Sequence, residues 1–444
     1  MLGARTLRGS LAGASYLIEL PARWNGVLLL YSHGGGGLVA NPPPENTIDP
    51  ATGGYLLQHG FALAGSSYRS SGWFIEDALA DDLALLDEFE RVVGHPTRTI
   101  AWGVSLGSMV TIGLAERHPE RIDGALAMCG VVADAVPFWN QNLDAAFAFK
   151  ILFAQSDPQI RITGADPSAA AGDRVRSLIA TAKNTAAGRA RTALVAALRE
   201  IPTSAFLSAG TSRLPVPTGV NLADARASLL ADLVADTLGS YLENHAAVEQ
   251  RAGGNPSSNV GVDYARLLAV SPDYAEVKDL YAMAAASLDD DVARLNSASR
   301  IAPDAKALTY LARYLTFSGD LRIPAVTLQT RADESTPAQL AIEYGDKVRA
   351  AGRSNWLLQL FVDRSAHCNF TTAEVVVALE TLLARIDTGR WMGDDLATLN
   401  ARSATFETRY WTPTRVVGGP PPRSYPSFVE FHSIGLLRHA SGQG

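Results

Sequence analysis

Short apolar runs alternate with amphipathic segments over the first third of the chain. Residues 27–31 and 61–65 form apolar runs of strand length, which is typical of strands buried on both faces. Residues 77–93 carry apolar side chains at helical spacing, with acidic residues on the other face. Strands expected at 99–102 and 122–128 enclose a helix at 106–117. This order of strand, helix and strand predicts a parallel sheet covered by helices.

The middle of the chain follows a different pattern. Its apolar spacing is helical, with long helices expected at 222–248 and 274–295 and no strand–helix rhythm. The rhythm then returns, with strands at 323–328 and 356–362 and helices at 337–351 and 372–386. We therefore expect four segments: an α/β core in two parts (1–134 and 321–400), a helical cap insertion (135–320), and a C-terminal extension packed on the core or on a partner subunit (401–444).

Composition excludes several classes of protein. The chain has 444 residues, which is longer than one ordinary domain. Of these residues 47% are apolar and 19% are charged, so the chain can bury a large core. The net charge of −7 argues against nucleic acid as a partner. No apolar run is long enough to predict a membrane span or a signal segment. We expect a cytoplasmic protein, or a secreted one if a signal segment has been removed.

A serine motif occupies the turn between an expected strand and an expected helix. Residues 103–107 read Gly-Val-Ser-Leu-Gly, which matches the G-x-S-x-G pattern in the structural context that the pattern requires. A serine at such a turn stands clear at the carboxyl edge of the sheet, and the following helix points its N-terminus at developing negative charge. The sequence therefore predicts Ser105 as a nucleophile.

A glycine-rich loop follows the strand at 27–31. It reads His33-Gly34-Gly35-Gly36-Gly37 and lacks the Lys-Ser/Thr of a phosphate-binding loop. Glycines let backbone N–H groups approach an oxyanion without interference from side chains. We expect an oxyanion hole formed by this loop, with Gly34, Gly35 and Gly36, together with the N–H of Leu106. His33 is expected to hold the loop.

One histidine and several acids lie at the same predicted edge. His367 follows the last expected strand and precedes the last long helix, as a general base for serine requires. Asp333 follows the preceding strand and completes the chain order Ser, Asp, His. Its neighbour Glu334 and the more distant Asp134 are alternative acids, whereas Asp363 is expected to be structural.

At these positions the chain resembles the α/β-hydrolase superfamily, and within it the esterases with a large cap. The resemblance covers about 17–134 and 322–388. It implies a mostly parallel eight-stranded sheet, a cap over the substrate pocket, and an acyl-enzyme mechanism without metal or cofactor.

The residue before the nucleophile is Val104. In tannase-like feruloyl esterases a cysteine there bridges to a cysteine after the base, and that bridge is impossible here. We expect Cys129 and Cys368 as separate buried thiols, with a disulfide between them left open.

Aromatic residues suggest the kind of substrate. Trp73 follows a strand at the active edge, and Phe138 and Trp139 stand at the entry of the insertion. They are expected either to line a pocket for a bulky hydrophobic group or to dock the cap. We therefore expect hydrolysis of a hydrophobic carboxylic ester or lactone, with a peptidase, amidase or acyltransferase as the alternative. A homodimer is a further alternative, which rests on aromatic residues of the tail: Tyr410, Trp411, Tyr425 and Phe428.

Overall fold

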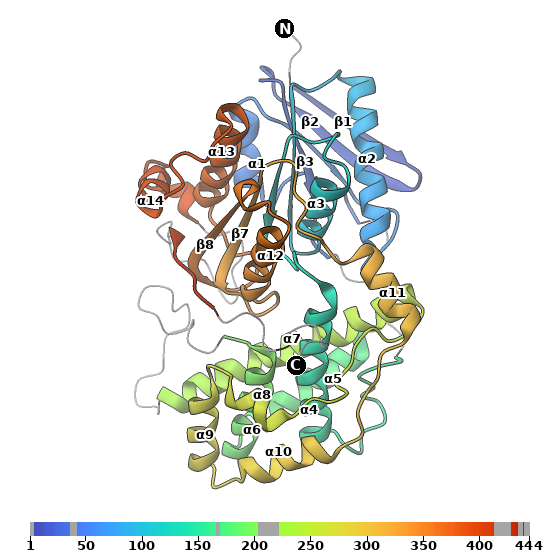
Figure 1. The fold of residues 1–444 in the computed structure, drawn as a ribbon, viewed down its shortest axis with the longest axis vertical. Helices are drawn as coiled ribbons and strands as arrows, with labels where there is room; N and C mark the ends of the chain where they lie inside the picture. Colours follow the sequence, from blue (N-terminus) through green and yellow to red (C-terminus); the bar gives the residue numbers. More distant parts are fainter. Residues whose placement is uncertain are drawn as a thin grey trace. The chain divides into compact units, whose positions relative to one another are not determined.

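The chain clusters into two compact units in the computed structural model, which describes residues 4–35, 42–165, 169–202, 222–412, 428–433 and 438. The first, here called the core unit, comprises Met1–Asp134 and Tyr314–Ser433. The second, the helical unit, comprises Ala135–Arg313 and Ile434–Gly444. The chain thus returns to the core unit at Tyr314, a few residues before the position 321 expected from the pattern (Figure 1).

The core unit contains a nine-stranded, mostly parallel sheet. Its strand order is β1-β2-β4-β3-β5-β6-β7-β8-β9, and the pairs β1–β2, β2–β4 and β8–β9 are antiparallel. The α/β class expected from the sequence is confirmed. The strands of the sheet span β1 Arg5–Leu11, β2 Ala14–Leu20, β3 Val27–Ser32, β4 Ala62–Ser66, β5 Arg98–Val104, β6 Gly124–Met128, β7 Ala325–Ala332, β8 Leu357–Ser365 and β9 Phe428–Val429.

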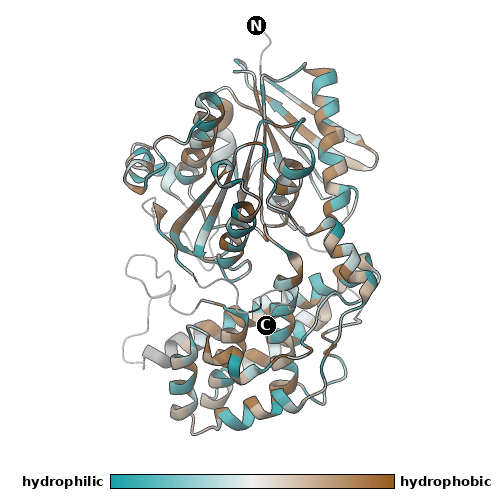
Figure 2. Cartoon of the chain, viewed as in Figure 1, coloured by the Kyte–Doolittle hydropathy of each residue, from teal (hydrophilic) through white to brown (hydrophobic). Residues whose placement is uncertain are grey.

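Helices pack on both faces of this sheet. Helices α1 and α13 contact one another, and so do α2 and α3 on the other side (Figure 1). Helix α2 turns its apolar stripe inward, and Figure 2 shows brown and teal residues alternating along it. The helices of the core unit span α1 Pro50–Gln58, α2 Ile75–Val92, α3 Leu106–Arg117, α12 Gln339–Ala350, α13 Thr372–Thr388 and α14 Leu396–Ala404, with 3₁₀ turns η2 at Ser354–Trp356 and η3 at Thr408–Trp411.

The two ends of the chain add strands that the pattern did not predict. The N-terminal hairpin β1–β2 turns at Ala12 and Gly13, both with positive φ. The two-residue strand β9 pairs with β8, which brings the sheet to nine strands rather than eight. Of the tail aromatics, Tyr410 and Phe428 are buried in the core unit. Tyr425 lies outside the described residues.

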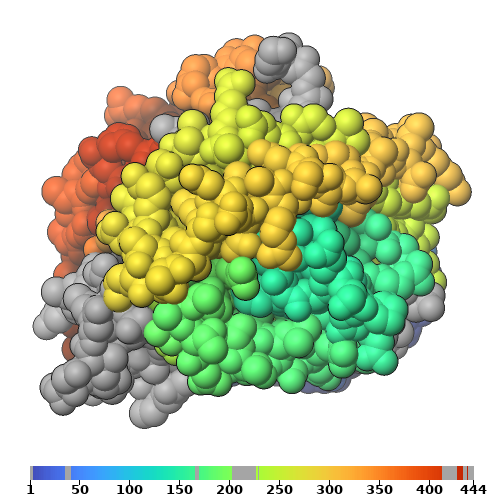
Figure 3. Space-filling view, turned by 90° about the horizontal axis from the view of Figure 1, so that it is seen from below, coloured from blue at the N-terminus to red at the C-terminus, as the bar shows by residue number. Residues whose placement is uncertain are grey.

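The helical unit consists of helices from the middle of the chain. Helix α10 packs on α4, and Figure 3 shows the yellow-to-orange surface of the later helices adjoining the green surface of the earlier ones. The single helix expected at 274–295 is wrong, because Ser287 caps a new helix by accepting a hydrogen bond from the N–H of Asp290 at 3.1 Å. The helices span α4 Ala135–Phe153, α5 Ala169–Ala182, α6 Ala186–Arg199, α7 Leu222–Ala252, α8 Tyr264–Ala269, α9 Tyr274–Met283, α10 Leu288–Ser297 and α11 Ala305–Tyr314.

A buried acid lies inside the helical unit. Asp144 on α4 is fully buried, accepts a hydrogen bond from the hydroxyl of Tyr264 at 2.9 Å, and lies 3.3 Å from Nε of Arg438. Arg438 also donates to the carbonyl of Ser258 at 2.7 Å, so this residue of the C-terminal segment is anchored in the helical unit. Burial nevertheless raises the pKa of Asp144 from 3.8 to about 7, with Arg438 opposing the rise.

This shift predicts a pH dependence of stability. Between about pH 4 and 7 the folded protein retains a proton on Asp144 that the unfolded chain has released, so this carboxyl lowers stability progressively as the pH rises through that range. We expect the melting temperature of Asp144→Asn to exceed that of wild type by more at pH 8 than at pH 5. Thermal unfolding of both proteins at each pH measures the difference. A difference that stays constant with pH would contradict the assignment.

Candidate active site

Four residues of interest follow consecutive strands at the carboxyl edge of the parallel sheet. Ser105 follows β5, Cys129 follows β6, Asp333 follows β7 and His367 follows β8 shortly after its end. Parallel strands present their carboxyl ends at one edge, where active sites of open α/β sheets are found. The register between β7 and β8 shifts between Thr330 and Ala332. Such irregularities re-aim the chain, here immediately before Asp333.

Ser105 lies in a sharp turn with a strained backbone. Its φ is 53° and its ψ is −122°, a combination that few non-glycine residues adopt. The turn is held by the N–H of Ser105, which donates to the carbonyl of Met128 at 2.9 Å. The turn also needs glycine beside it. A Cβ on Gly107 would lie 1.9 Å from the carbonyl oxygen of Ser32, and one on Gly103 would lie 2.6 Å from the same atom.

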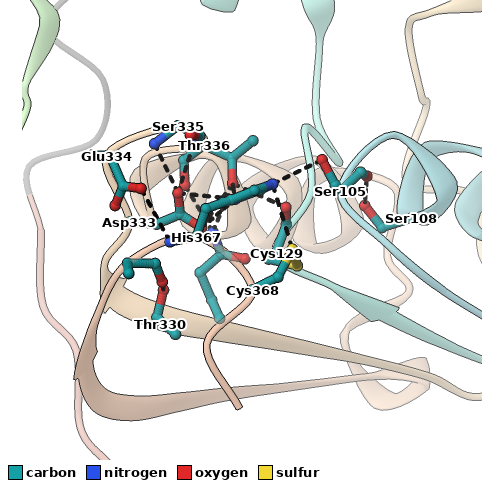
Figure 4. The surroundings of a disulfide bond; sticks show 12 residues. Ser105, Ser108, Cys129, Thr330, Asp333, Glu334, Ser335, Thr336, His367 and Cys368 are labelled. Atoms are coloured by element: carbon teal, nitrogen blue, oxygen red, sulfur yellow. Dashed lines mark hydrogen bonds and ion pairs between the residues drawn. A yellow bond between two sulfur atoms is a disulfide. The ribbon is translucent and has the colours of Figure 1, made fainter. Parts of the chain in front are cut away.

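The structure brings Ser105, His367 and Asp333 into one hydrogen-bonded chain (Figure 4). Nε2 of His367 lies 2.8 Å from Oγ of Ser105. Nδ1 of the same ring lies 2.8 Å from Oδ2 and 3.1 Å from Oδ1 of Asp333. Because Asp333 accepts at Nδ1, Nε2 is free to accept the serine proton. This is the geometry that a nucleophile, its base and an orienting acid require.

Backbone and hydroxyl donors hold the Asp333 carboxylate in place. Oδ1 accepts hydrogen bonds from the N–H groups of Ser335 at 2.9 Å and Thr336 at 2.8 Å. The hydroxyl of Thr336 lies 3.0 Å from Oδ2 and 2.9 Å from the carbonyl of Cys129. Thr336 thus links the loops after β6 and β7, a role that the sequence pattern did not predict.

The loop that carries His367 is also strained and held from several sides. Ala366 and Cys368 on either side of the histidine have φ values of 75° and 54°. The hydroxyl of Thr330 donates to the carbonyl of Ala366 at 3.0 Å. Beyond the loop, the buried ion pair of Arg364 and Glu374 joins the end of β8 to the first turn of α13, with 2.6 Å between Nη1 and Oε2. Strain of this kind persists only where surrounding contacts over-determine the conformation.

Cys129 and Cys368 form a disulfide, with their Cα atoms 5.2 Å apart. The expectation of two separate thiols is therefore wrong. The reason is topological: Cys129 directly follows β6 and Cys368 follows β8, and both reach the same edge of the sheet beside β7. The two cysteines are 239 residues apart in the sequence, so no local pattern indicated that they lie close together. The bridge connects the loop after β6 to the loop of the base.

The alternative acids lie elsewhere. Asp134 accepts from the hydroxyl of Thr316 at 3.2 Å and lies 3.7 Å from Nζ of Lys347. Asp363 pairs with Arg331 at 2.6 Å, which agrees with its expected structural role. Glu334 contacts His367 through the main chain only, with Oε1 3.3 Å from the histidine N–H. Asp333 is thus the acid that meets the imidazole ring.

The glycine-rich loop approaches the serine. A Cβ on Gly34 would lie 3.2 Å from Cβ of Ser105, whereas one on Gly35 would meet nothing within 4 Å. His33 is buried, stacks on Tyr68 with 4.4 Å between ring centroids, and donates from Nδ1 to the carbonyl of Gly34 at 2.6 Å. Gly36 lies outside the described residues. Leu106 begins α3, so its N–H has no partner within the helix.

The expected substrate-binding aromatics fall in both units. Trp73 is buried in the core unit, in the connecting segment that follows β4 and precedes α2 in the sequence. Phe138 and Trp139 are buried in the helical unit: Phe138 lies beneath the guanidinium of Arg199, and Trp139 contacts the rings of Tyr241 and His245. These contacts account for the burial of Phe138 and Trp139, and the role of all three aromatic residues toward a substrate stays a prediction.

Two further findings concern metals and membranes. Among the residues that the structure describes, Cys129, His367 and Cys368 are the one group with metal-ligand spacing, but the disulfide removes both thiolates. Within the same residues, no helix combines the length and apolar character that crossing a bilayer requires.

Comparison with known proteins identifies the family. Residues 12–334 match the model of a tannase-like family of unknown function, DUF6351. The chain belongs to this tannase-like family. A curated relative, an o-phthalyl amidase of Xanthobacter agilis, is 30% identical over 424 residues, which cover 89% of this chain and 90% of that protein. Membership in a tannase-like family agrees with the hydrolase resemblance predicted from the motifs, and the protein is a hydrolase.

Solved structures similar to this tannase-like chain are more distant. An esterase of Aspergillus oryzae has 12% identity and a TM-score of 0.41, and the match covers 87% of this chain and 79% of that one. A tannin acyl hydrolase of Aspergillus niger has 13% identity and a TM-score of 0.41, with 87% and 78% covered.

Proposed function

We propose that this protein is a serine hydrolase that cleaves a carboxylic ester or lactone of a bulky hydrophobic substrate. The observation that carries the proposal is the continuous chain of hydrogen bonds from Oγ of Ser105 through the His367 ring to Asp333, with 2.8 Å at each step. The strained turn at Ser105 and the close approach of Gly34 support the same conclusion.

The proposed reaction has two steps. His367 accepts the proton of Ser105 as the hydroxyl oxygen attacks the carbonyl carbon, and the N–H groups of Leu106 and of the Gly34–Gly36 loop stabilise the oxyanion. The leaving alcohol takes the proton from His367 and departs, which leaves an acyl-enzyme. Water then attacks with His367 again as base, and the acid is released. A lactone opens in the same way into a single product.

An amide bond is the second candidate. The observation that favours it is the relation to the o-phthalyl amidase, which extends over nearly the whole of both chains. An amine is a poorer leaving group than an alcohol and must be protonated as it departs, which His367 is placed to do. Trp73, in the same unit as Ser105, Asp333 and His367, is the aromatic side chain proposed to contact an aryl acyl group.

Active-site labelling tests the catalytic assignment. A fluorophosphonate probe is expected to label the wild-type protein covalently and to leave Ser105→Ala unlabelled. Ser354→Ala, which removes an exposed serine in η2, serves as the matched control and is expected to label like wild type. Labelling of the Ser105→Ala protein at the wild-type rate would refute the proposal.

A substrate panel distinguishes the bonds. Matched 4-nitrophenyl esters of benzoic and butyric acid, lactones of increasing ring size, and the monoester and monoamide of phthalic acid are compared by kcat/KM. We expect esters or lactones with aromatic groups to have the highest kcat/KM. Preference for the monoamide would instead support the second candidate.

A further inference from the structure

Glu334 lies beside the proposed base and has no role in the mechanism above. It immediately follows Asp333 in the loop between β7 and α12. Its Oε1 accepts a hydrogen bond from the main-chain N–H of His367 at 3.3 Å (Figure 4). This N–H lies between Ala366 and Cys368, the two residues with left-handed backbone. The contact therefore supports the strained segment that carries the imidazole.

The second oxygen of Glu334 points to an electrostatic role. Oε2 is buried and has no hydrogen-bond partner within the described part of the chain. Burial and the neighbouring charge of Asp333 raise the pKa of Glu334, whereas the charge of His367 opposes the rise. The last effect is reciprocal: a carboxylate stabilised by an imidazolium stabilises that imidazolium in return.

In the described part of the chain, two ion pairs flank the His367 loop. Arg364 and Glu374 form a buried ion pair, and Arg331 pairs with Asp363 at 2.6 Å. Asp333, which binds Nδ1, and Glu334 supply the negative charge that faces the histidine from the β7 loop.

We propose that Glu334 is a positioning residue for His367, which holds the main chain of the base by a hydrogen bond and stabilises with its charge the imidazolium formed during catalysis. The inference rests on the proposed function, because it assigns a second carboxylate to the same base. His367 would then lie between two carboxylates, one at the ring and one at the backbone.

Two isosteric or charge-preserving variants separate the two roles. Glu334→Gln keeps an oxygen that accepts from the His367 N–H but removes the charge. We expect kcat to fall about tenfold with KM nearly unchanged, and the acid limb of the kcat/KM profile to move about one unit to lower pH. Glu334→Asp keeps the charge on a shorter side chain. We expect its acid limb to match wild type while kcat falls, because the hydrogen bond lengthens.

The measurement uses the full chain and the ester that wild type cleaves fastest, with circular dichroism to verify folding. Asp363→Asn removes a nearby carboxylate that does not contact His367, and we expect its acid limb to remain within about 0.2 unit of wild type. The pH dependence of fluorophosphonate labelling provides a second readout. An acid limb unchanged in Glu334→Gln would overturn the electrostatic role while wild-type turnover still upholds the proposed function. Absence of both turnover and labelling in the wild-type protein would refute the proposed function and, with it, the role of Glu334.

Discussion

Replacement of Asp333 by Asn is expected to lower kcat by about four orders of magnitude. The carboxylate accepts from Nδ1 of His367 at 2.8 Å and so keeps the proton on that nitrogen. An amide can present its N–H₂ group to Nδ1 and favour the tautomer that is protonated at Nε2. That tautomer cannot accept the proton of Ser105. The amide oxygen can still accept from the N–H groups of Ser335 and Thr336, so the turn should persist.

The matched control for this prediction is Asp134→Asn. Asp134 was one of two alternative acids in the sequence, but it contacts Thr316 and Lys347 instead of the imidazole. Its variant is expected to retain kcat within about twofold of wild type. Steady-state kinetics on the preferred ester compares the two variants. Equal losses in both, or less than a tenfold loss in Asp333→Asn, would show that Asp333 is not the acid.

Gly107→Ala is expected to destabilise the core unit by about 3 kcal/mol, or to prevent folding. The added Cβ would lie 1.9 Å from the carbonyl oxygen of Ser32 and 2.6 Å from that of His33. These are backbone atoms, and Ser32 is further held by its hydrogen bond to the buried Asp82 at 2.7 Å. The clash is therefore relieved only by moving α3 away from β3, which also displaces Ser105.

Gly54→Ala provides the control for this second prediction. Gly54 is also helical, in α1, but a Cβ there meets nothing within 4 Å. Alanine in a helix is favoured over glycine by about 0.5–1 kcal/mol, so this variant should be at least as stable as wild type. Thermal and urea unfolding of the two variants measure the contrast. Wild-type stability in Gly107→Ala would contradict the close packing at the serine turn.

Local patterns were sufficient wherever one segment buries its own apolar face. The helix at 106–117 was predicted with the bounds that the structure has, and the core strands were placed within a few residues. The prediction failed where the signal was short. The break between α9 and α10 depends on one capping serine, Ser287. Strand β9 has two residues, which form a strand only because they pair with β8.

The sequence by itself determined the α/β class, the turn at Ser105 and the order of the three proposed catalytic residues. Each depends on local chemistry: apolar periodicity, glycines at a tight turn, and side chains that follow strands. Only the tertiary structure decided which acid meets the imidazole, that Cys129 and Cys368 form a disulfide, and that Glu334 contacts the base. These pairings join loops after different strands, and their distances depend on strand order and register, which no local pattern encodes.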